Sequence, residues 1–208
     1  MNLGKFPVFP LKTLCFPGHK IPLKIFEDRY LQMLKDIEED PCFIISLISS
    51  GEEVGRDATP YRVGTLVEIG TIQNQGDFRL IRPQGLHRVY MDSFDRESKP
   101  YLQAQCSEYE DDLSEALAIE AGAETDLKQG IADLEKGILK LISVLGPEES
   151  RSIRDVMEGL KVELDQENFS LFLCGCLHLP PIYLQRFLES KSLRYRIDNA
   201  LNLLKQEK

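Results

Sequence analysis

The residues best suited to hold a metal ion are two cysteines and a histidine near the C-terminal end, Cys174, Cys176 and His178. Thiolate and imidazole are ligands that zinc prefers in proteins. On a helix, however, Cys174 and His178 share one face while Cys176 points away by about 200°. A structural zinc site also needs four ligands, usually from two clusters, and the remaining histidines, His19 and His87, stand alone. We therefore expect buried thiols, no metal site and no cofactor.

A cysteine nucleophile with a general base is the next chemistry that the sequence suggests, because Cys15 is followed four residues later by His19. The turn residues Pro17-Gly18 lie between them, and no third group that would orient the histidine can be identified. We expect a strand cysteine and a turn histidine here. No catalytic residue is therefore assigned.

Nucleotide hydrolysis would require a glycine-rich phosphate loop that ends in Lys and then Ser or Thr. The nearest glycine pair, Gly51 and Gly55, has the wrong spacing and is followed by Arg56. We expect these glycines to serve a hairpin or loop. Without a phosphate loop, or a nucleophile with its base and orienting group, the chain is predicted not to be an enzyme.

Three arginines, Arg79, Arg82 and Arg88, alternate with aliphatic side chains. They would either line a groove for an acidic ligand or face solvent from strands. The chain as a whole is acidic, with 25 Lys and Arg against 34 Asp and Glu and a net charge of −9. Nucleic acid and anionic membranes both favour a basic surface, so we predict neither as a partner.

The length of 208 residues and the hydrophobic fraction of 42% suffice for one large domain or two small ones. The five cysteines are an odd number and lie mostly in apolar runs, as in cytosolic proteins with reduced thiols. Residues 1–5 lack the apolar segment of a signal peptide, and the longest apolar stretch, 169–179, is too short to span a bilayer. We expect a cytoplasmic protein.

The first half of the chain reads as strands that would position most of these residues. Candidate strands are the opening 6–11 and the segments 42–48, 63–69, 78–83, 86–90 and 101–106. Prolines in the opening indicate edge or bulged strands, and Gln75-Gly76-Asp77 is typical of a turn. One helix is predicted at 26–39, ending before Pro41. Several short strands separated by turns favour a closed or nearly closed barrel.

The second half reads as helices, after a change in composition at 108–112. One narrow apolar seam predicts a long helix, and its members are Leu127, Ile131, Leu134, Ile138, Leu141 and Leu145. Further helices are predicted around 153–160, at 169–179, at 182–188 and at 193–204, the last with Ser192 as N-cap. Strands followed by helices predict an α+β chain, divided into subdomains 1–112 and 113–208.

The order of several motifs resembles a known family. The segments are Phe6-Pro7-Val8-Phe9-Pro10-Leu11, then 16–30, 53–69, 79–89, 100–104 and 179–201. Together they resemble the N-terminal substrate-binding domain, or LON domain, of Lon-type ATP-dependent proteases. In those proteases an ATPase and a peptidase follow this domain. This chain carries neither module before Lys208, and so it resembles the stand-alone bacterial LON-domain proteins.

The resemblance implies a fold and a function. The fold is a PUA-like pseudo β-barrel with one inserted helix, followed by a C-terminal helical bundle. The function is non-catalytic binding of unfolded or extended polypeptide, or of a protein partner. Two alternatives stay open, a stand-alone hydrolase of unknown substrate and a structural adaptor that docks on a folded partner.

A helix motif that the family shares, Phe26-Glu27-x-Arg29-Tyr30, is expected to be structural. Phe26 and Tyr30 would share one helix face in the core. Glu27 would lie at the helix N-terminus, where a negative charge suits the dipole. We expect Arg29 to pair with a carboxylate of the barrel.

The peptide-binding residues that we predict lie on two signature loops and a neighbouring hairpin. They are His19, Lys20, Tyr61, Arg62 and Arg82. We expect them to hold an extended apolar segment in a groove between the barrel and the helical half, by adding a strand to an exposed edge. The alternative is that these loops only close the barrel.

Overall fold

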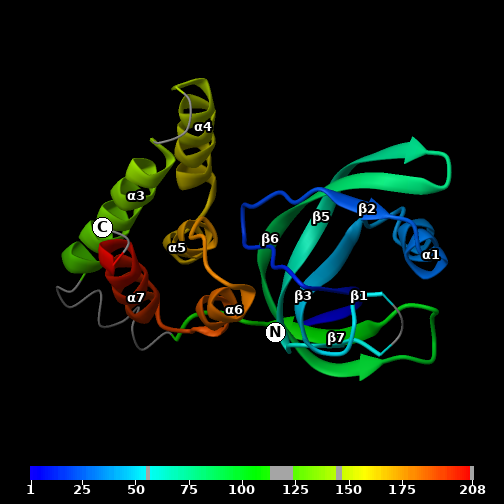
Figure 1. The fold of residues 1–208 in the computed structure, drawn as a ribbon. Helices are drawn as coiled ribbons and strands as arrows, with labels where there is room; N and C mark the ends of the chain where they lie inside the picture. Colours follow the sequence, from blue (N-terminus) through cyan, green and yellow to red (C-terminus); the bar gives the residue numbers. More distant parts are fainter. Residues whose placement is uncertain (55–56, 113–123, 144–146, 207–208) are drawn as a thin grey trace. The chain divides into compact units, whose positions relative to one another are not determined.

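The computed structural model describes residues 1–54, 57–112, 124–143 and 147–206 (Figure 1). The chain forms two compact units, Met1–Tyr109 and Glu110–Lys208. Within the described residues, every strand lies in the first unit, and the second unit contains helices. The structure is thus a mixture of sheet and helix. A subdomain boundary at residue 112 stays a prediction.

The first unit is built from seven strands and the helix α1. The strands are β1 (Asn2–Leu11), β2 (Leu23–Ile25), β3 (Cys42–Ser50), β4 (Thr59–Pro60), β5 (Val63–Gln75), β6 (Phe78–Asp95) and β7 (Gln103–Glu108). The pairing order β1-β7-β6-β5-β3 returns to β1, because β1 pairs antiparallel with β7 and parallel with β3. The first half of β1 pairs with β7 and its second half with β3. The proline-rich opening is therefore a strand shared between two partners.

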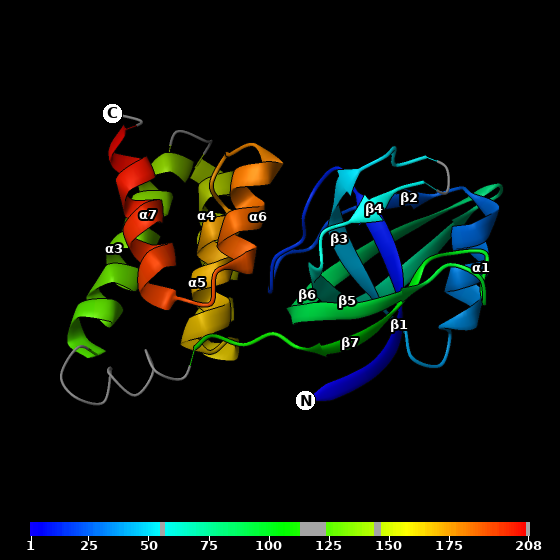
Figure 2. The ribbon, with the colours of Figure 1, turned by 90° about the horizontal axis from the view of Figure 1, so that it is seen from below.

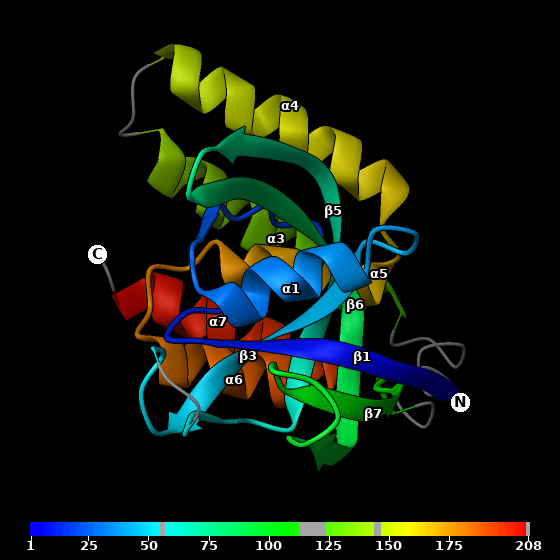
Figure 3. The same cartoon turned by 90° about the vertical axis from the view of Figure 1, so that its right-hand side faces the viewer.

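Two cores lie on opposite faces of β1 and β3, because successive side chains of a strand point to opposite faces. Val8 and Ile44 belong to one core, and Phe9 and Ile45 to the other. The second core is covered by α1 (Asp28–Asp36), which Figure 3 shows in front of the strands. There the ring centroids of Phe9 and Tyr30 are 4.1 Å apart.

The helix α1 is shorter than the predicted 26–39, and two expectations about its motif are wrong. Phe26 precedes the helix and is 55% exposed, so it is not a core residue. Glu27 is the N-cap residue, as its position in the motif indicates. Arg29 pairs with Glu27 at 3.0 Å and donates to the backbone carbonyl of Glu53 at 3.4 Å. The carboxylate partner of Arg29 is therefore Glu27, within the same motif. Glu53 of the strand-rich unit contacts Arg29 only through its backbone carbonyl.

The second unit contains α3 (Glu124–Ile142), α4 (Pro147–Glu163), α5 (Gln166–Gly175), α6 (Pro181–Glu189) and α7 (Leu193–Gln206). Figure 2 shows α3 beside α7. The two helices approach closely where Ile197 and Leu204 occupy the space that a β-carbon at Gly130 or Gly137 would take. No described helix is long and apolar enough to cross a membrane.

The helix predictions agree with the structure except at some ends. Ser192 caps α7, accepting from the backbone N–H of Tyr195 at 3.0 Å. The apolar seam of α3 is buried from Leu127 to Ile138, whereas Leu141 is 36% exposed and Leu145 lies outside the described residues. The helix α5 ends at Gly175, so exposed His178 lies beyond it and does not share a helix face with Cys174.

The carboxylate of Asp36, at the end of α1, joins this helix to the segment between β6 and β7. It accepts hydrogen bonds from Lys99 Nζ at 2.9 Å, Tyr101 Oη at 2.8 Å and Gln32 Nε2 at 2.7 Å. These bonds, with that from Lys99 the largest cause, lower the pKa of Asp36 to about 2.

We expect Asp36→Asn to lower the free energy of unfolding near neutral pH and to lose this effect in acid. The native pKa lies below the value of about 3.9 in an unfolded chain, so the stabilisation is complete above pH ~4 and fades as the pH falls through ~2. Because Asp36 is largely exposed, the expected loss at pH 6 is only about 0.5–1 kcal/mol. Urea denaturation at both pH values measures it, and a gap that is equal at pH 6 and pH 2 would contradict the assignment.

Candidate functional site

The candidate site is one face of a three-stranded segment formed by β2, the first part of β6 and the last part of β5. Leu23 pairs with Ile81, and Leu80 pairs with Gln73. Side chains alternate in and out, so that Ile25 and Ile81 are buried while their neighbours are exposed. We call the exposed side the outer face, and it consists of Lys20, Pro22, Lys24, Thr71, Gln73, Leu80 and Arg82.

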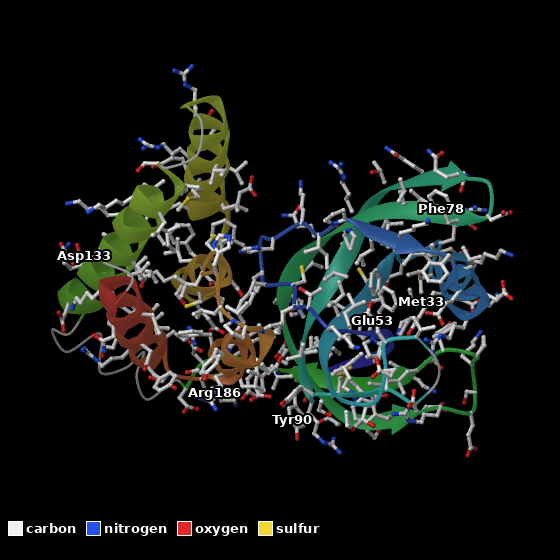
Figure 4. All side chains as sticks on the ribbon, viewed as in Figure 1. Met33, Glu53, Phe78, Tyr90, Asp133 and Arg186 are labelled. Atoms are coloured by element: carbon white, nitrogen blue, oxygen red, sulfur yellow. The ribbon has the colours of Figure 1, made fainter. Side chains whose placement is uncertain are left out.

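A tight turn and a paired extension hold this segment in place. Gly76 has a φ of +66°, as the first central residue of a two-residue hairpin loop requires, and the predicted turn is confirmed. Pairing with β6 continues before β2, because Lys20 forms an isolated bridge with Gln84 and Ile21 N–H donates to Pro83 O at 3.2 Å. Figures 1 and 4 show the β5–β6 hairpin, with Phe78 near its tip, extending past β2.

The outer face is hollowed between β2 and the hairpin. A groove with a cavity volume of about 220 Å³ is lined by Pro22, Leu23, Lys24, Thr71, Gln73, Leu80, Ile81 and Arg82. Leu80 is 38% exposed at the surface of this groove. The groove therefore offers apolar contact beside polar and charged side chains, which is the usual composition of a binding site.

Three cations surround the groove. Arg82 lies across from Pro22, and Lys20 and Lys24 lie two residues to either side of Pro22. The ammonium of Lys24 lies 4.2 Å from the centroid of the Phe78 ring. Among the described residues, neither the Lys20 ammonium nor the Arg82 guanidinium has an ion-pair or hydrogen-bond partner. Their positive charges are thus not neutralised by described acidic residues.

Two acidic residues border this face without lining the groove. Glu68 is exposed and pairs across the sheet with Gln84, one step from Arg82 on the same face. Asp77 lies in the turn at the hairpin tip. The lining itself contains no acidic side chain, so the groove carries net positive charge in a chain of net charge −9.

The loop that contains His19 is fixed to β6 by its backbone. Gly18 N–H donates to Gly85 O at 2.9 Å, and Gly85 N–H donates to His19 O at 2.9 Å. Gly85 allows this approach, because a β-carbon there would lie 2.2 Å from Phe16 O. Cys15 Sγ lies 3.5 Å from the backbone carbonyl of His19, and burial raises the pKa of the thiol to about 12. This cysteine is a buried thiol rather than a nucleophile.

Tyr61 and Arg62 lie at another place in the first unit. Arg62 Nη1 donates to Met91 O and Asp92 O, each at 2.8 Å, and Met91 N–H donates to Arg62 O at 2.8 Å. Tyr61 is held by Ser46 Oγ, which donates to its carbonyl at 2.8 Å. Since β6 rises by about 3.3 Å per residue, the contacts of Arg62 near Met91 are about 20 Å from Gln84. The structure therefore gathers His19, Lys20 and Arg82 and separates Tyr61 and Arg62 from them.

The three alternating arginines have three different environments. Arg82 is exposed, as predicted, and Arg79 Nη1 donates to Gly76 O at 2.9 Å in the hairpin turn. Arg88, however, is only 2% exposed, so the expectation that it faces solvent is wrong. Its guanidinium lies 5.2 Å from the centroid of the Tyr109 ring. This contact joins Arg88 to the end of the first unit, and spacing within the strand does not reveal it.

Cys174, Cys176 and His178, the residues best suited to hold a metal, belong to no metal-binding group among the described residues. No group of three or more His, Cys, Asp or Glu side chains that could hold a metal occurs in the part of the chain that the structure describes. All five cysteines are free. Burial raises the pKa of Cys174 and of Cys176 to about 12, which favours the neutral thiol over the thiolate that binds metals.

Sequence reasoning missed Lys24, Leu80 and Gln73 as members of the outer face. A signal existed, because residues 20–25 alternate Lys-Ile-Pro-Leu-Lys-Ile and place every second side chain on one face. The sequence did not, however, indicate which strand pairs with this segment. The contact between β2 and β6 joins residues almost sixty positions apart, and this long-range pairing creates the groove.

Comparison with known proteins gives one family and several solved structures. The model of the ATP-dependent protease La (LON) substrate-binding domain matches residues 5–206. The N-terminal domain of Mycobacterium avium complex Lon protease superposes with a TM-score of 0.68 at 14% identity, covering 97% of this chain and 98% of that one. A Lon N-terminal domain protein from Xanthomonas campestris gives 0.59 at 16% identity, covering 96% and 98%. No curated protein matches.

Proposed function

Because the chain belongs to the LON substrate-binding domain family, we propose that it is a non-catalytic module that binds unfolded or extended polypeptide on the outer face of β2, β5 and β6. The observation that carries this proposal is the groove of about 220 Å³, in which Pro22 and Leu80 lie beside Lys24 and Arg82. An apolar side chain of a passing polypeptide can occupy such a groove, while polar groups hold its backbone.

The proposal favours a binding module over an enzyme. The matched family is a substrate-binding domain, and burial raises the pKa of Cys15, the cysteine four residues before His19, to about 12, which favours the neutral thiol. A cytoplasmic location and a PUA-like barrel made by the closed ring of strand pairings are parts of the same proposal. A structural adaptor remains the second candidate, and it predicts binding of one folded partner instead of many unfolded chains.

Among the five predicted residues we propose two roles. Lys20 and Arg82 contact the polypeptide, because both are exposed at the groove and have no described ion-pair partner. Arg62 holds the start of β5 against β6 through its two hydrogen bonds to backbone carbonyls. His19 and Tyr61 lie in loops whose backbones are bonded to neighbouring segments, His19 to Gly85 of β6 and Tyr61 to β3, so they support the fold.

We expect an NMR titration of the full chain with a reduced, alkylated polypeptide to shift backbone resonances of β2 and of the β5–β6 hairpin. Affinity should be modest, on the order of micromolar to millimolar, because ordering a flexible chain offsets much of the contact energy. Leu80→Asn should weaken binding about tenfold, since it removes apolar contact from the groove. Val162→Asn on α4, where the side chain is 87% exposed, is the matched control and should change nothing.

Two results would reject this site. One is a set of shifts confined to the helices of the second unit, and the other is no shift at millimolar polypeptide. Saturable binding of a single folded protein, with no response to unfolded chains, would instead favour the adaptor. Circular dichroism of each variant shows whether the fold is intact.

A further inference from the structure

The cations of the outer face form one compact group. Lys20, Pro22 and Lys24 occupy alternate positions of one strand segment, so neighbours on this face are about 7 Å apart. Arg82 lies directly across from Pro22. Diagonal neighbours in an antiparallel pair are separated by about 7–8 Å, which places both lysines within reach of a group bound at Arg82. The apolar part of the groove on this face, at Pro22 and Leu80, lies beside this group.

The charge of this group is opposite to that of the rest of the chain. The protein carries 34 acidic and 25 basic residues, yet three basic side chains meet here beside a groove whose lining has no acidic one. A cation without a counter-ion is available to a ligand, and its field also raises the rate of encounter with a negative partner. Glu68 and Asp77, at the borders, reduce the local charge without cancelling it.

We propose that the outer face selects polypeptide segments in which a carboxylate lies within two residues of an apolar side chain. The inference rests on the proposed function and specifies its substrate class. The apolar side chain enters the groove against Pro22 and Leu80, which share the outer face. The carboxylate accepts hydrogen bonds from the Arg82 guanidinium, whose planar pair of donors matches its two oxygens. Lys20 and Lys24 receive further acidic residues to either side.

A polynucleotide is a poorer match to this face. Single-stranded nucleic acid is usually held by aromatic side chains on which bases stack. The aromatic side chain at this face, Phe78, lies under the Lys24 ammonium. The overall charge of −9 also repels a polyanion. A short acidic-apolar peptide carries few charges and supplies the apolar contact that a nucleic acid lacks.

The test uses three fluorescent nonapeptides that differ only beside a central Leu-Val pair, with Glu, Gln or Lys on both sides. Anisotropy titrations use the full chain at low salt. We expect the Glu peptide to bind about tenfold more tightly than the Gln peptide, as two or three exposed ion pairs would give, and the Lys peptide to bind least. Raising the salt concentration should shrink this difference, since the groups are exposed.

Variants locate the effect. Arg82→Gln should remove most of the preference for Glu over Gln, measured as the ratio of the two peptides' affinities for the same variant. Arg154→Gln on α4, which removes an exposed arginine in the second unit, is the matched control and should keep the preference. A preference that persists in Arg82→Gln would overturn the assignment of the carboxylate to this residue.

The outcomes separate the inference from the function on which it rests. Equal binding of the Glu and Gln peptides would overturn the acidic preference and leave polypeptide binding standing. No binding of any peptide would overturn both. A nine-nucleotide RNA that binds more tightly than the Glu peptide would overturn the inference in favour of a nucleic-acid ligand.

Discussion

Gly85→Ala is expected to destabilise the protein by about 3 kcal/mol, which is severe for a single added methyl group. The new β-carbon would lie 2.2 Å from Phe16 O, 2.8 Å from Phe16 C and 3.2 Å from the Cα of Pro17. All three are backbone atoms, so no side chain can rotate away. The loop must move, and the two hydrogen bonds that join residues 18 and 19 to Gly85 would be strained or lost. Urea denaturation measures the change.

Gly70→Ala is the matched control for this substitution. Gly70 also lies in a strand of the same unit, but nothing comes within 4 Å of the position of its β-carbon. Replacing it should leave the free energy of unfolding within about 0.5 kcal/mol of the original. Equal midpoints for the two alanine variants would show that the loop near Phe16 yields easily, and would contradict the close approach.

Asp111→Ala should cost about 3–5 kcal/mol, because it leaves a buried guanidinium without its counter-ion. The side chain of Arg196 is fully buried and forms a two-pronged pair with the Asp111 carboxylate, with Nη1 at 2.6 Å from Oδ1. Arg196 also donates to Ser170 Oγ at 3.1 Å and to Ser190 O at 2.9 Å. Four segments of the second unit therefore meet at one cation. Denaturation followed by circular dichroism measures the loss.

A second variant and a control make this prediction specific. Removing both partners with Asp111→Leu and Arg196→Met should recover much of the stability, since replacing a buried pair by apolar groups is often neutral. Arg194 and Asp126 form an ion pair at 3.2 Å, but their side chains are 46% and 75% exposed. Arg194→Ala should thus cost at most about 1 kcal/mol. Similar losses of unfolding free energy in Asp111→Ala and Arg194→Ala would contradict the prediction that the buried ion pair contributes more to stability than the exposed one.

Local signals in the sequence predict the local parts of this structure well. The turn at Gly76, the N-cap at Ser192 and the buried seam from Leu127 to Ile138 follow from turn chemistry, capping and helical spacing, which act within a few residues. The change from strands in the first half to helices in the second half is likewise predicted from local sequence patterns.

Non-local pairing accounts for what the sequence did not predict. The sequence suggested two strands, 78–83 and 86–90, separated by residues 84–85, whereas β6 is continuous from Phe78 to Asp95. Proline lacks an N–H, but the paired residue Ile21 requires only an acceptor. The carbonyl of Pro83 supplies it by accepting from Ile21 N–H, so Pro83 is tolerated within this strand. The contact of the Arg88 guanidinium with the Tyr109 ring likewise joins residues about twenty positions apart.

The candidate site follows the same division. Lys20 and Arg82 are visible in the sequence as exposed cations in motifs that resemble the family. In the structure Arg82 lines the groove, and Lys20 lies beside it, opposite Gln84. Lys24 and Leu80 were not predicted, because they join the site only through the pairing of β2 with β6. Arg62 was predicted beside them, but its bonds to Met91 and Asp92 place it at another part of β6.

The pairing of residues 20–25 with β6 also bears on self-assembly of the chain. Ile21 and Leu23 direct their backbone groups toward β6, so the groups of Lys20, Pro22 and Lys24 point to the opposite edge. Proline has no N–H, which leaves a gap in the row of donors that an added strand would need. The flanking lysines repel the same edge of a second copy. This edge is therefore protected against edge-to-edge polymerisation, the hazard that sheet proteins with open edges must avoid.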